Sequence, residues 1–231
     1  MQPNSLTVQR ILDEALTTVL NEKISTTGAG RTDSGVHASV FVAHFDYSGS
    51  DLTKKKNLIF RLNRFLPEDI SVTTFRKVFP DASARFSAVS RTYKYFISRS
   101  KDPFRVDTAW FLYGELNIES MNKASELMMI HSDFTSFSRL HSDNKTNICR
   151  VFKARWEESG NKLVFTIKAD RFLRNMVRAI TGTMVEVGRG KLSLVDFERI
   201  ILSKNRSTAG MSAPARGLFL ADIEYPEEIF I

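Results

Sequence analysis

A short loop near the start of the chain combines residue types that can do chemistry. It reads Gly-Ala-Gly-Arg-Thr-Asp-Ser-Gly over residues 28–35, and its glycines permit a sharp turn that leaves Arg31 and Asp33 at a surface. One interpretation makes Asp33 a turn residue with Arg31 as its salt-bridge partner. The other makes Asp33 a lone carboxylate acting as nucleophile or base, since no second acid, histidine pair or serine triad stands nearby. The loop lacks the ending of a nucleotide-binding loop.

Basic and aromatic residues alternate in a second segment, Ser90-Arg-Thr-Tyr-Lys-Tyr95. A strand here would place Tyr93 and Tyr95 on one face and Arg91 near the edge. Tyrosine rings that stack on bases, beside cations that hold phosphate, are a common way to bind RNA. The alternative is an ordinary pair of core tyrosines with solvated cations. On the first interpretation Arg91 contacts the substrate.

A third segment predicts a long helix from about Arg171 to Val187, ended by glycines. Arg171, Arg174 and Arg178 fall at positions i, i+3 and i+7 and would share one helix face. A plain amphipathic surface helix explains this spacing as well as an RNA-facing helix does. On the RNA-facing interpretation, Arg171 and Arg174 are candidates for substrate binding.

Composition limits the classes of protein and of site. The 231 residues include 33 Lys and Arg against 26 Asp and Glu, a net charge of +7 that suits a polyanionic partner. A single cysteine, Cys149, excludes an intrachain disulfide and fits a reducing compartment. The four histidines show no metal-ligand spacing, so we expect no metal. No apolar run has the length of a membrane span and no export signal is visible.

Hydrophobic periodicity predicts the elements that must position these residues. Helices are expected near residues 6–20, 54–65, 118–130, 171–187 and 194–202, and strands near residues 38–47, 70–79, 91–99, 151–157, 163–169 and 217–225. This order predicts an α+β fold with antiparallel pairing. Without a flexible linker, the chain is expected to form two tightly packed α+β halves, residues 1–82 and 83–231, joined near residues 80–84.

Five segments follow one another along the chain in a characteristic order. They are Gly30-Arg-Thr-Asp-Ser-Gly-Val-His-Ala38; Ala84-Arg-Phe-Ser-Ala88 with Arg91-Thr-Tyr-Lys-Tyr95; Asp133-Phe-Thr-Ser-Phe137; Phe172-Leu-Arg-Asn-Met-Val-Arg178 with Gly182 and Glu186-Val-Gly188; and Ala213-Pro-Ala-Arg-Gly-Leu-Phe-Leu220. Together they resemble the TruA family of tRNA pseudouridine synthases along nearly the whole chain.

The resemblance implies a fold, an activity and partners. The fold would be two RNP-like (ferredoxin-like) half-domains with a continuous, mostly antiparallel sheet flanked by helices, around a central basic cleft. The activity would be isomerisation of uridine to pseudouridine at positions 38, 39 and 40 in the anticodon stem-loop of tRNA. The resemblance further implies a cytoplasmic homodimer that needs no cofactor or metal and does not bind a membrane.

The resemblance also implies roles for single residues. Asp33 would attack the target uridine at the base or the ribose, so that uracil detaches, turns and rejoins through carbon 5. Tyr93 would stack on the base and help remove the proton from carbon 5, and Arg178 would pair with Asp33 and keep it ionised. Leu218 would pack against the base, and Arg31 would engage phosphate or the flipped nucleotide.

The chain departs from this family at its beginning. Family members open with a strand and a Tyr-Asp-Gly-Thr-x-Tyr-x-Gly-Trp-Gln segment before the Gln-Pro-Asn that stands here at residues 2–4, so we expect that first strand to be missing. Two alternatives stay open beside the synthase. One is a non-catalytic tRNA-binding protein or chaperone of the same fold, and the other is a hydrolase with Asp33 as its nucleophile.

Overall fold

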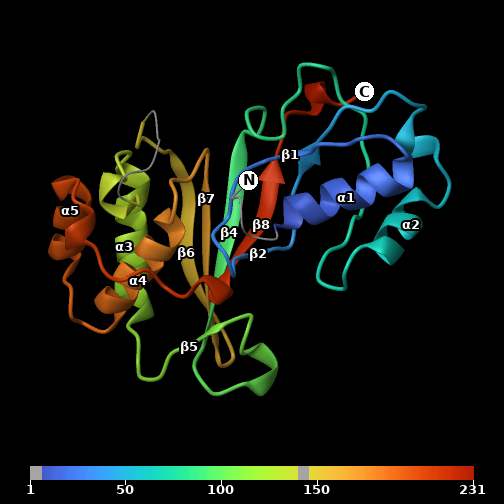
Figure 1. Ribbon diagram of the computed structural model, residues 1–231. Helices are drawn as coiled ribbons and strands as arrows, with labels where there is room; N and C mark the ends of the chain where they lie inside the picture. Colours follow the sequence, from blue (N-terminus) through green and yellow to red (C-terminus); the bar gives the residue numbers. More distant parts are fainter. Residues whose placement is uncertain (1–6, 140–145) are drawn as a thin grey trace. The chain divides into compact units, whose positions relative to one another are not determined.

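A computed structural model describes residues 7–139 and 146–231 of the chain (Figure 1). Its helices are α1 (Val8–Leu20), α2 (Leu58–Phe65), α3 (Ile118–Ile130), α4 (Met176–Gly188) and α5 (Leu194–Ser203). Its strands are β1 (Thr27–Gly28), β2 (His37–Ala38), β3 (Ala43–His44), β4 (Ser90–Ser98), β5 (Trp110–Phe111), β6 (Val151–Ser159), β7 (Lys162–Ala169) and β8 (Leu218–Glu224). Helices and strands alternate irregularly around mostly antiparallel pairs, which confirms the α+β class.

Two compact units share the chain. The first comprises Met1–Arg31, Val42–Ala88 and Tyr225–Ile231, and the second comprises Thr32–Phe41 and Val89–Glu224. The segment that carries Asp33 therefore belongs to the second unit, although it lies early in the sequence. The division into half-domains 1–82 and 83–231 stays a prediction, because compactness does not test independent folding.

The first unit is built on the packing of α1 against α2. Thr7 caps α1 by accepting a hydrogen bond from the Arg10 N–H, and the helix buries Ala15 and Leu16 against Leu62 of α2. The strand expected over residues 70–79 is wrong in this unit. The side chain of Asn63 binds both the N–H and the carbonyl of Val72, which replaces a sheet partner at that position.

The second unit is a six-stranded sheet with helices on one face. Its strand order is β2-β8-β4-β7-β6, with β5 beside β4. The pairs β2–β8 and β4–β5 are parallel and the other pairs are antiparallel. Helices α3, α4 and α5 lie together beside this sheet (Figure 1). The core between them includes Trp156 stacked on Phe165, with ring centroids 4.7 Å apart. This core holds α4 in place, and α4 carries one of the residues of the site described below.

Two further expectations about strands need correction. The described strands form two separate sheets, β1–β3 and the six-stranded sheet, rather than one continuous sheet. The expected strand over residues 38–47 is two short strands, because β2 pairs with β8 while β3 pairs with β1. Alternation of apolar and polar residues with a period of two fits two short strands with different partners as well as it fits one long strand. Within residues 7–139 and 146–231, no helix has the length and apolar character needed to cross a bilayer.

Candidate active site

The loop that carries Asp33 is held in place by a turn and by a sheet. The Val36 N–H donates to the Asp33 carbonyl over 3.1 Å, and Gly35 completes this turn with a φ of 78°, which favours glycine. Immediately after the turn, β2 pairs with β8, and the Ser39 N–H donates to the Leu220 carbonyl over 2.8 Å. The backbone of Asp33 is therefore anchored a few residues from the sheet.

Asp33 is in contact with two arginines. Arg178 Nη1 donates to Asp33 Oδ2 over 2.8 Å, and Arg174 Nε lies 3.9 Å from Asp33 Oδ1. The side chains of Asp33 and Arg178 are only 22% and 21% exposed, whereas that of Arg174 is 52% exposed. Partial burial reduces solvent screening, so the Asp33–Arg178 pair is stronger than an ion pair in open water. Two of the three arginines of the expected basic stripe thus converge on the expected carboxylate.

The prediction that the three arginines lie on one helix face, however, is wrong. Helix α4 begins at Met176, after Asn175 with a left-handed φ of 66°. The preceding turn is held away from helical geometry by Asp170, whose carboxylate accepts the N–H groups of Arg150 and Arg171. Arg171 and Arg174 therefore lie in an irregular segment and do not share a helix face with Arg178.

Tyr93 lies on β4 beside this pair. Its ring meets that of Phe172 edge to face, with centroids 5.0 Å apart. Burial raises the pKa of Tyr93 to about 12, Arg91 opposes the rise, and the negative charge of Asp33 adds to it. The negative charge of Asp33 therefore interacts electrostatically with the Tyr93 hydroxyl. At neutral pH, Tyr93 is accordingly a neutral phenol.

The other expected site residues have different surroundings. Leu218 is 6% exposed and opens β8 opposite Tyr95 of β4, in the core of the second unit. Arg91 Nη1 donates to the Asp170 carbonyl over 3.0 Å, so it supports the irregular segment before α4. Arg171 lies in that segment and is partly exposed. Arg31 is exposed and belongs to the first unit.

A segment to which the sequence analysis assigned no role crosses α4 at Arg178. We call residues 209–214 the strap. Arg178 Nε donates to the Ala213 carbonyl over 2.8 Å, and the Ala213 N–H donates to the Arg178 carbonyl over 2.9 Å. A Cβ atom on Gly182 would lie 1.7 Å from the carbonyl oxygen of Met211, so this glycine permits the close approach. In the sequence, Gly182 is the residue whose lack of a side chain signals such a close approach.

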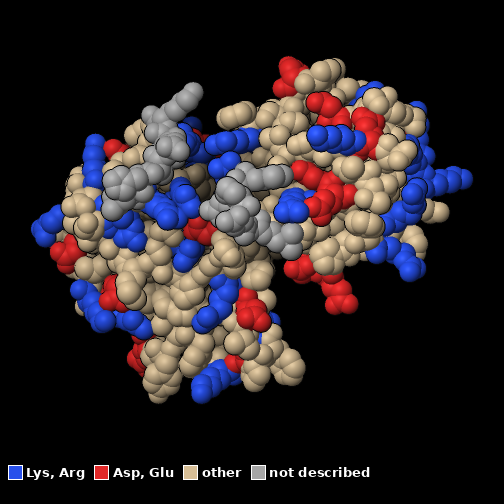
Figure 2. All heavy atoms as spheres, viewed as in Figure 1, with Lys and Arg blue, Asp and Glu red and all other residues tan. Residues whose placement is uncertain are grey.

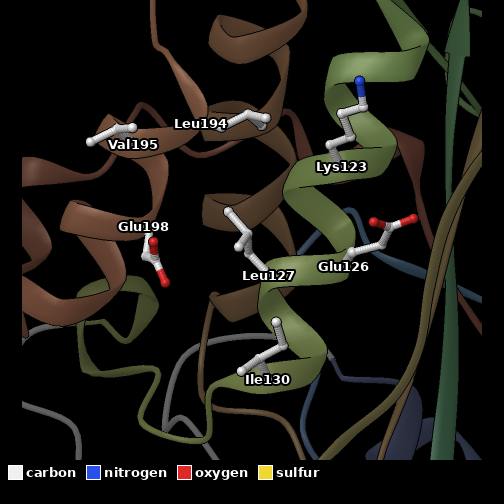
Figure 3. Close-up of a pocket in the computed structure, with 7 residues that line it drawn as sticks. All are labelled: Lys123, Glu126, Leu127, Ile130, Leu194, Val195 and Glu198. Carbon is white, nitrogen blue, oxygen red and sulfur yellow. The ribbon is translucent and has the colours of Figure 1, made fainter.

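The surface of the second unit is rich in cations. Figure 2 shows Lys and Arg side chains spread over the visible face around the helices, with fewer Asp and Glu side chains among them. Such a surface attracts a polyanion. A separate hollow of about 300 Å³ lies between α3 and α5 and is lined by Leu127 and Ile130 of α3 and by Leu194 of α5 (Figure 3). None of the expected site residues lines it.

Comparison with known proteins gives a consistent result. A family model described as tRNA pseudouridine synthase matches residues 131–226. The tRNA pseudouridine synthase A of Bacteroides fragilis is 53% identical over 231 residues, which is 100% of this chain and 91% of the relative. The protein of that name from Bacteroides thetaiotaomicron is 51% identical over 100% of this chain and 86% of its own length. That from Bacillus licheniformis is 39% identical over 97% and 92%.

Proposed function

Because the chain belongs to the family of tRNA pseudouridine synthases, we propose that it isomerises uridine to pseudouridine in tRNA with Asp33 as the catalytic carboxylate. The observation that carries the proposal is the contact of 2.8 Å between Arg178 Nη1 and Asp33 Oδ2 in a partly buried place. The pair brings together two segments that are 145 residues apart and that were singled out separately in the sequence.

For this reaction the protein must supply a carboxylate and must keep the detached uracil in place. Asp33 attacks the uridine at carbon 6 of the base or carbon 1′ of the ribose, and the bond between nitrogen 1 and carbon 1′ breaks. The uracil turns, carbon 5 bonds to carbon 1′, and the proton on carbon 5 leaves as the carboxylate is released. Nitrogen 1 takes up a proton from water, so the product is an isomer of the substrate. Arg178 holds one carboxylate oxygen and leaves Oδ1 for attack, with Arg174 near it at 3.9 Å.

Tyr93 serves this reaction as a neutral phenol. Since burial raises its pKa to about 12, a phenolate is scarce at neutral pH and is not the base that takes the carbon 5 proton. Its ring forms an aromatic wall for the base, and its hydroxyl can relay the proton to the freed carboxylate or to water. Leu218 supplies apolar contact, and Arg31, Arg91, Arg171 and Arg174 bind RNA phosphate or the flipped nucleotide.

The finer parts of the proposal rest on the family motifs. The substrate positions are uridines 38, 39 and 40 of the anticodon stem-loop, and the working form is a cytoplasmic homodimer with RNP-like half-domains around a basic cleft. The net charge of +7 and the cations in Figure 2 support an RNA-binding surface. A hydrolase would pair its nucleophile with an acid or a histidine, whereas within residues 7–139 and 146–231 the ion pairs of Asp33 are with Arg174 and Arg178.

The test uses unmodified tRNA with tritium at carbon 5 of uridine, so that each isomerisation releases one label. We expect label release by the wild type and a loss of about a thousandfold or more in Asp33→Asn, as for removal of other catalytic nucleophiles. Asp69→Asn is the matched control, because Asp69 is an exposed residue of the first unit. tRNA binding is measured in parallel. Binding by wild type and Asp33→Asn without label release from either would refute catalysis and establish the non-catalytic tRNA-binding alternative.

A further inference from the structure

The direction of the Arg178 guanidinium depends on the strap. Arg178 uses Nε for the Ala213 carbonyl and Nη1 for Asp33, and its own carbonyl accepts the Ala213 N–H. A planar guanidinium has its donors in fixed directions. When Ala213 moves, the bond from Nη1 to Asp33 must therefore bend or lengthen.

The strap itself has few bonds of regular secondary structure, so other groups must hold it. Arg206, in the 3₁₀ turn Arg206–Thr208, provides three contacts from one side chain. Its Nη1 donates to the carbonyls of Gly210 over 3.2 Å and Ala209 over 3.4 Å, and its Nη2 donates to Ser212 Oγ over 3.0 Å. Backbone carbonyls in an irregular, partly buried segment need such donors.

Three other side chains also hold the strap. Asn175 Nδ2 donates to Ser212 Oγ over 2.6 Å, and two more side chains bind nearer the ends of the strap. Thr183 Oγ1 accepts the Gly210 N–H over 2.9 Å, and the Tyr95 hydroxyl donates to the Pro214 carbonyl over 2.8 Å. Thr183 fixes the first part of the strap to α4, and Tyr95 fixes the last residue to β4. Arg206 is the group that spans the middle, from Ala209 to Ser212, next to Ala213.

We propose that Arg206 is a positioning residue for catalysis, which acts through the strap to aim Arg178 at Asp33. The inference rests on the proposed function, since it gives that function's ion pair a support. The hydrogen bonds of Arg206 described above go to the strap, so its effect on Arg178 passes through the strap, which meets Arg178 at Ala213. Removing it should lower the rate of the chemical step while leaving tRNA binding intact.

The first measurement compares kcat and KM of Arg206→Met with those of the wild type in the label-release assay. We expect kcat to fall between about tenfold and a hundredfold, with KM and tRNA affinity unchanged, because small misplacements of catalytic groups cost rates of this size. Arg199→Met is the matched control, since Arg199 lies on α5, is 73% exposed and pairs with Asp196. It should keep the wild-type kcat.

The second measurement tests the route through Arg178. Arg178→Lys loses the rigid guanidinium fork that links Ala213 to Asp33; in that background, Arg206→Met should change kcat less than about twofold if the two residues form one unit. The nuclear magnetic resonance signal of the Arg178 Nε–H provides a readout that needs no activity. It should shift or broaden in Arg206→Met and stay unchanged in Arg199→Met.

These outcomes separate the inference from the proposed function. No label release by the wild type would refute the function, while the Nε–H signal would still test the link from Arg206 to Arg178. A kcat for Arg206→Met within twofold of the wild type, or rate losses that multiply in the double variant, would overturn the inference. If Arg206→Met unfolds at the assay temperature, Arg206→Lys provides the same test, because it keeps the charge and the stem but loses the fork.

Discussion

Replacing Gly182 by alanine should damage both the stability and the activity of this protein. The new Cβ would lie 1.7 Å from the Met211 carbonyl oxygen, and the strap would have to retreat until the separation reaches at least 3.0 Å. A backbone forced out of a packed position costs about 1–3 kcal/mol. Replacing a glycine within a helix by alanine stabilises the helix by at most about 1 kcal/mol, which offsets only part of this cost. We therefore expect a net loss of about 1–2 kcal/mol, which lowers the melting temperature by roughly 2–8 °C for a chain of this length.

Gly188→Ala is a matched control on the same helix. Its Cβ would meet the side chain of Met121, with the sulfur at 2.6 Å, and the end of Leu116 at 3.2 Å. A methionine side chain is flexible and moves aside at small cost, so this variant should melt within a few degrees of the wild type. Because retreat of the strap also displaces Ala213, Gly182→Ala should lose kcat in the label-release assay. Equal melting temperatures for the two variants, measured by circular dichroism, would refute the reasoning.

Two further predictions concern titrating groups in the second unit. Because the folded pKa of Tyr93 is about 12 and its usual value is 10.0, its contribution to stability is complete below pH 10 and is lost as the pH rises to about 12. Urea unfolding from pH 9 to 12 should show a steeper loss in the wild type than in Tyr93→Phe, and equal slopes would contradict the assigned environment. Burial raises the pKa of the Cys149 thiol to about 12, so iodoacetamide at pH 8 should label the native protein slowly and the urea-unfolded protein quickly, as counted by mass spectrometry. Labelling of the native protein at the rate of a free thiol would show that this core opens.

The sequence predicted best those elements whose signals are local. Helix α3 spans Ile118–Ile130 as expected, because Asn117 caps it by accepting the Ser120 N–H and its apolar residues recur at helical spacing. The hairpin of β6 and β7 turns at Gly160, which has a φ of 61°. The start of α4 was missed because the Asp170 carboxylate accepts nearby backbone N–H groups and Asn175 has a left-handed backbone, and helical spacing registers neither feature.

The candidate site was predictable in its residue types and only partly in its contacts. Motif reading brought Asp33 and Arg178 together correctly across 145 residues. It did not find Arg206, whose partners in the strap are two backbone carbonyls and a hydroxyl. Every residue has a backbone carbonyl, so the sequence does not indicate which carbonyls accept a side-chain hydrogen bond. A contact to backbone leaves no pattern of paired side chains to read.

The parallel pairing of β2 with β8 sets the time at which the site can assemble during protein synthesis. His37 pairs with Phe219, so the strand next to the Asp33 loop finds its neighbour only after residue 219 has left the ribosome. Contacts between such distant residues are slow to form, whereas early segments can fold as they emerge. The nascent chain should therefore carry its carboxylate loop unpaired until β8 has been synthesised, and a product that stops after α5 would contain Asp33 and Arg178 yet lack the strand and strap that hold them.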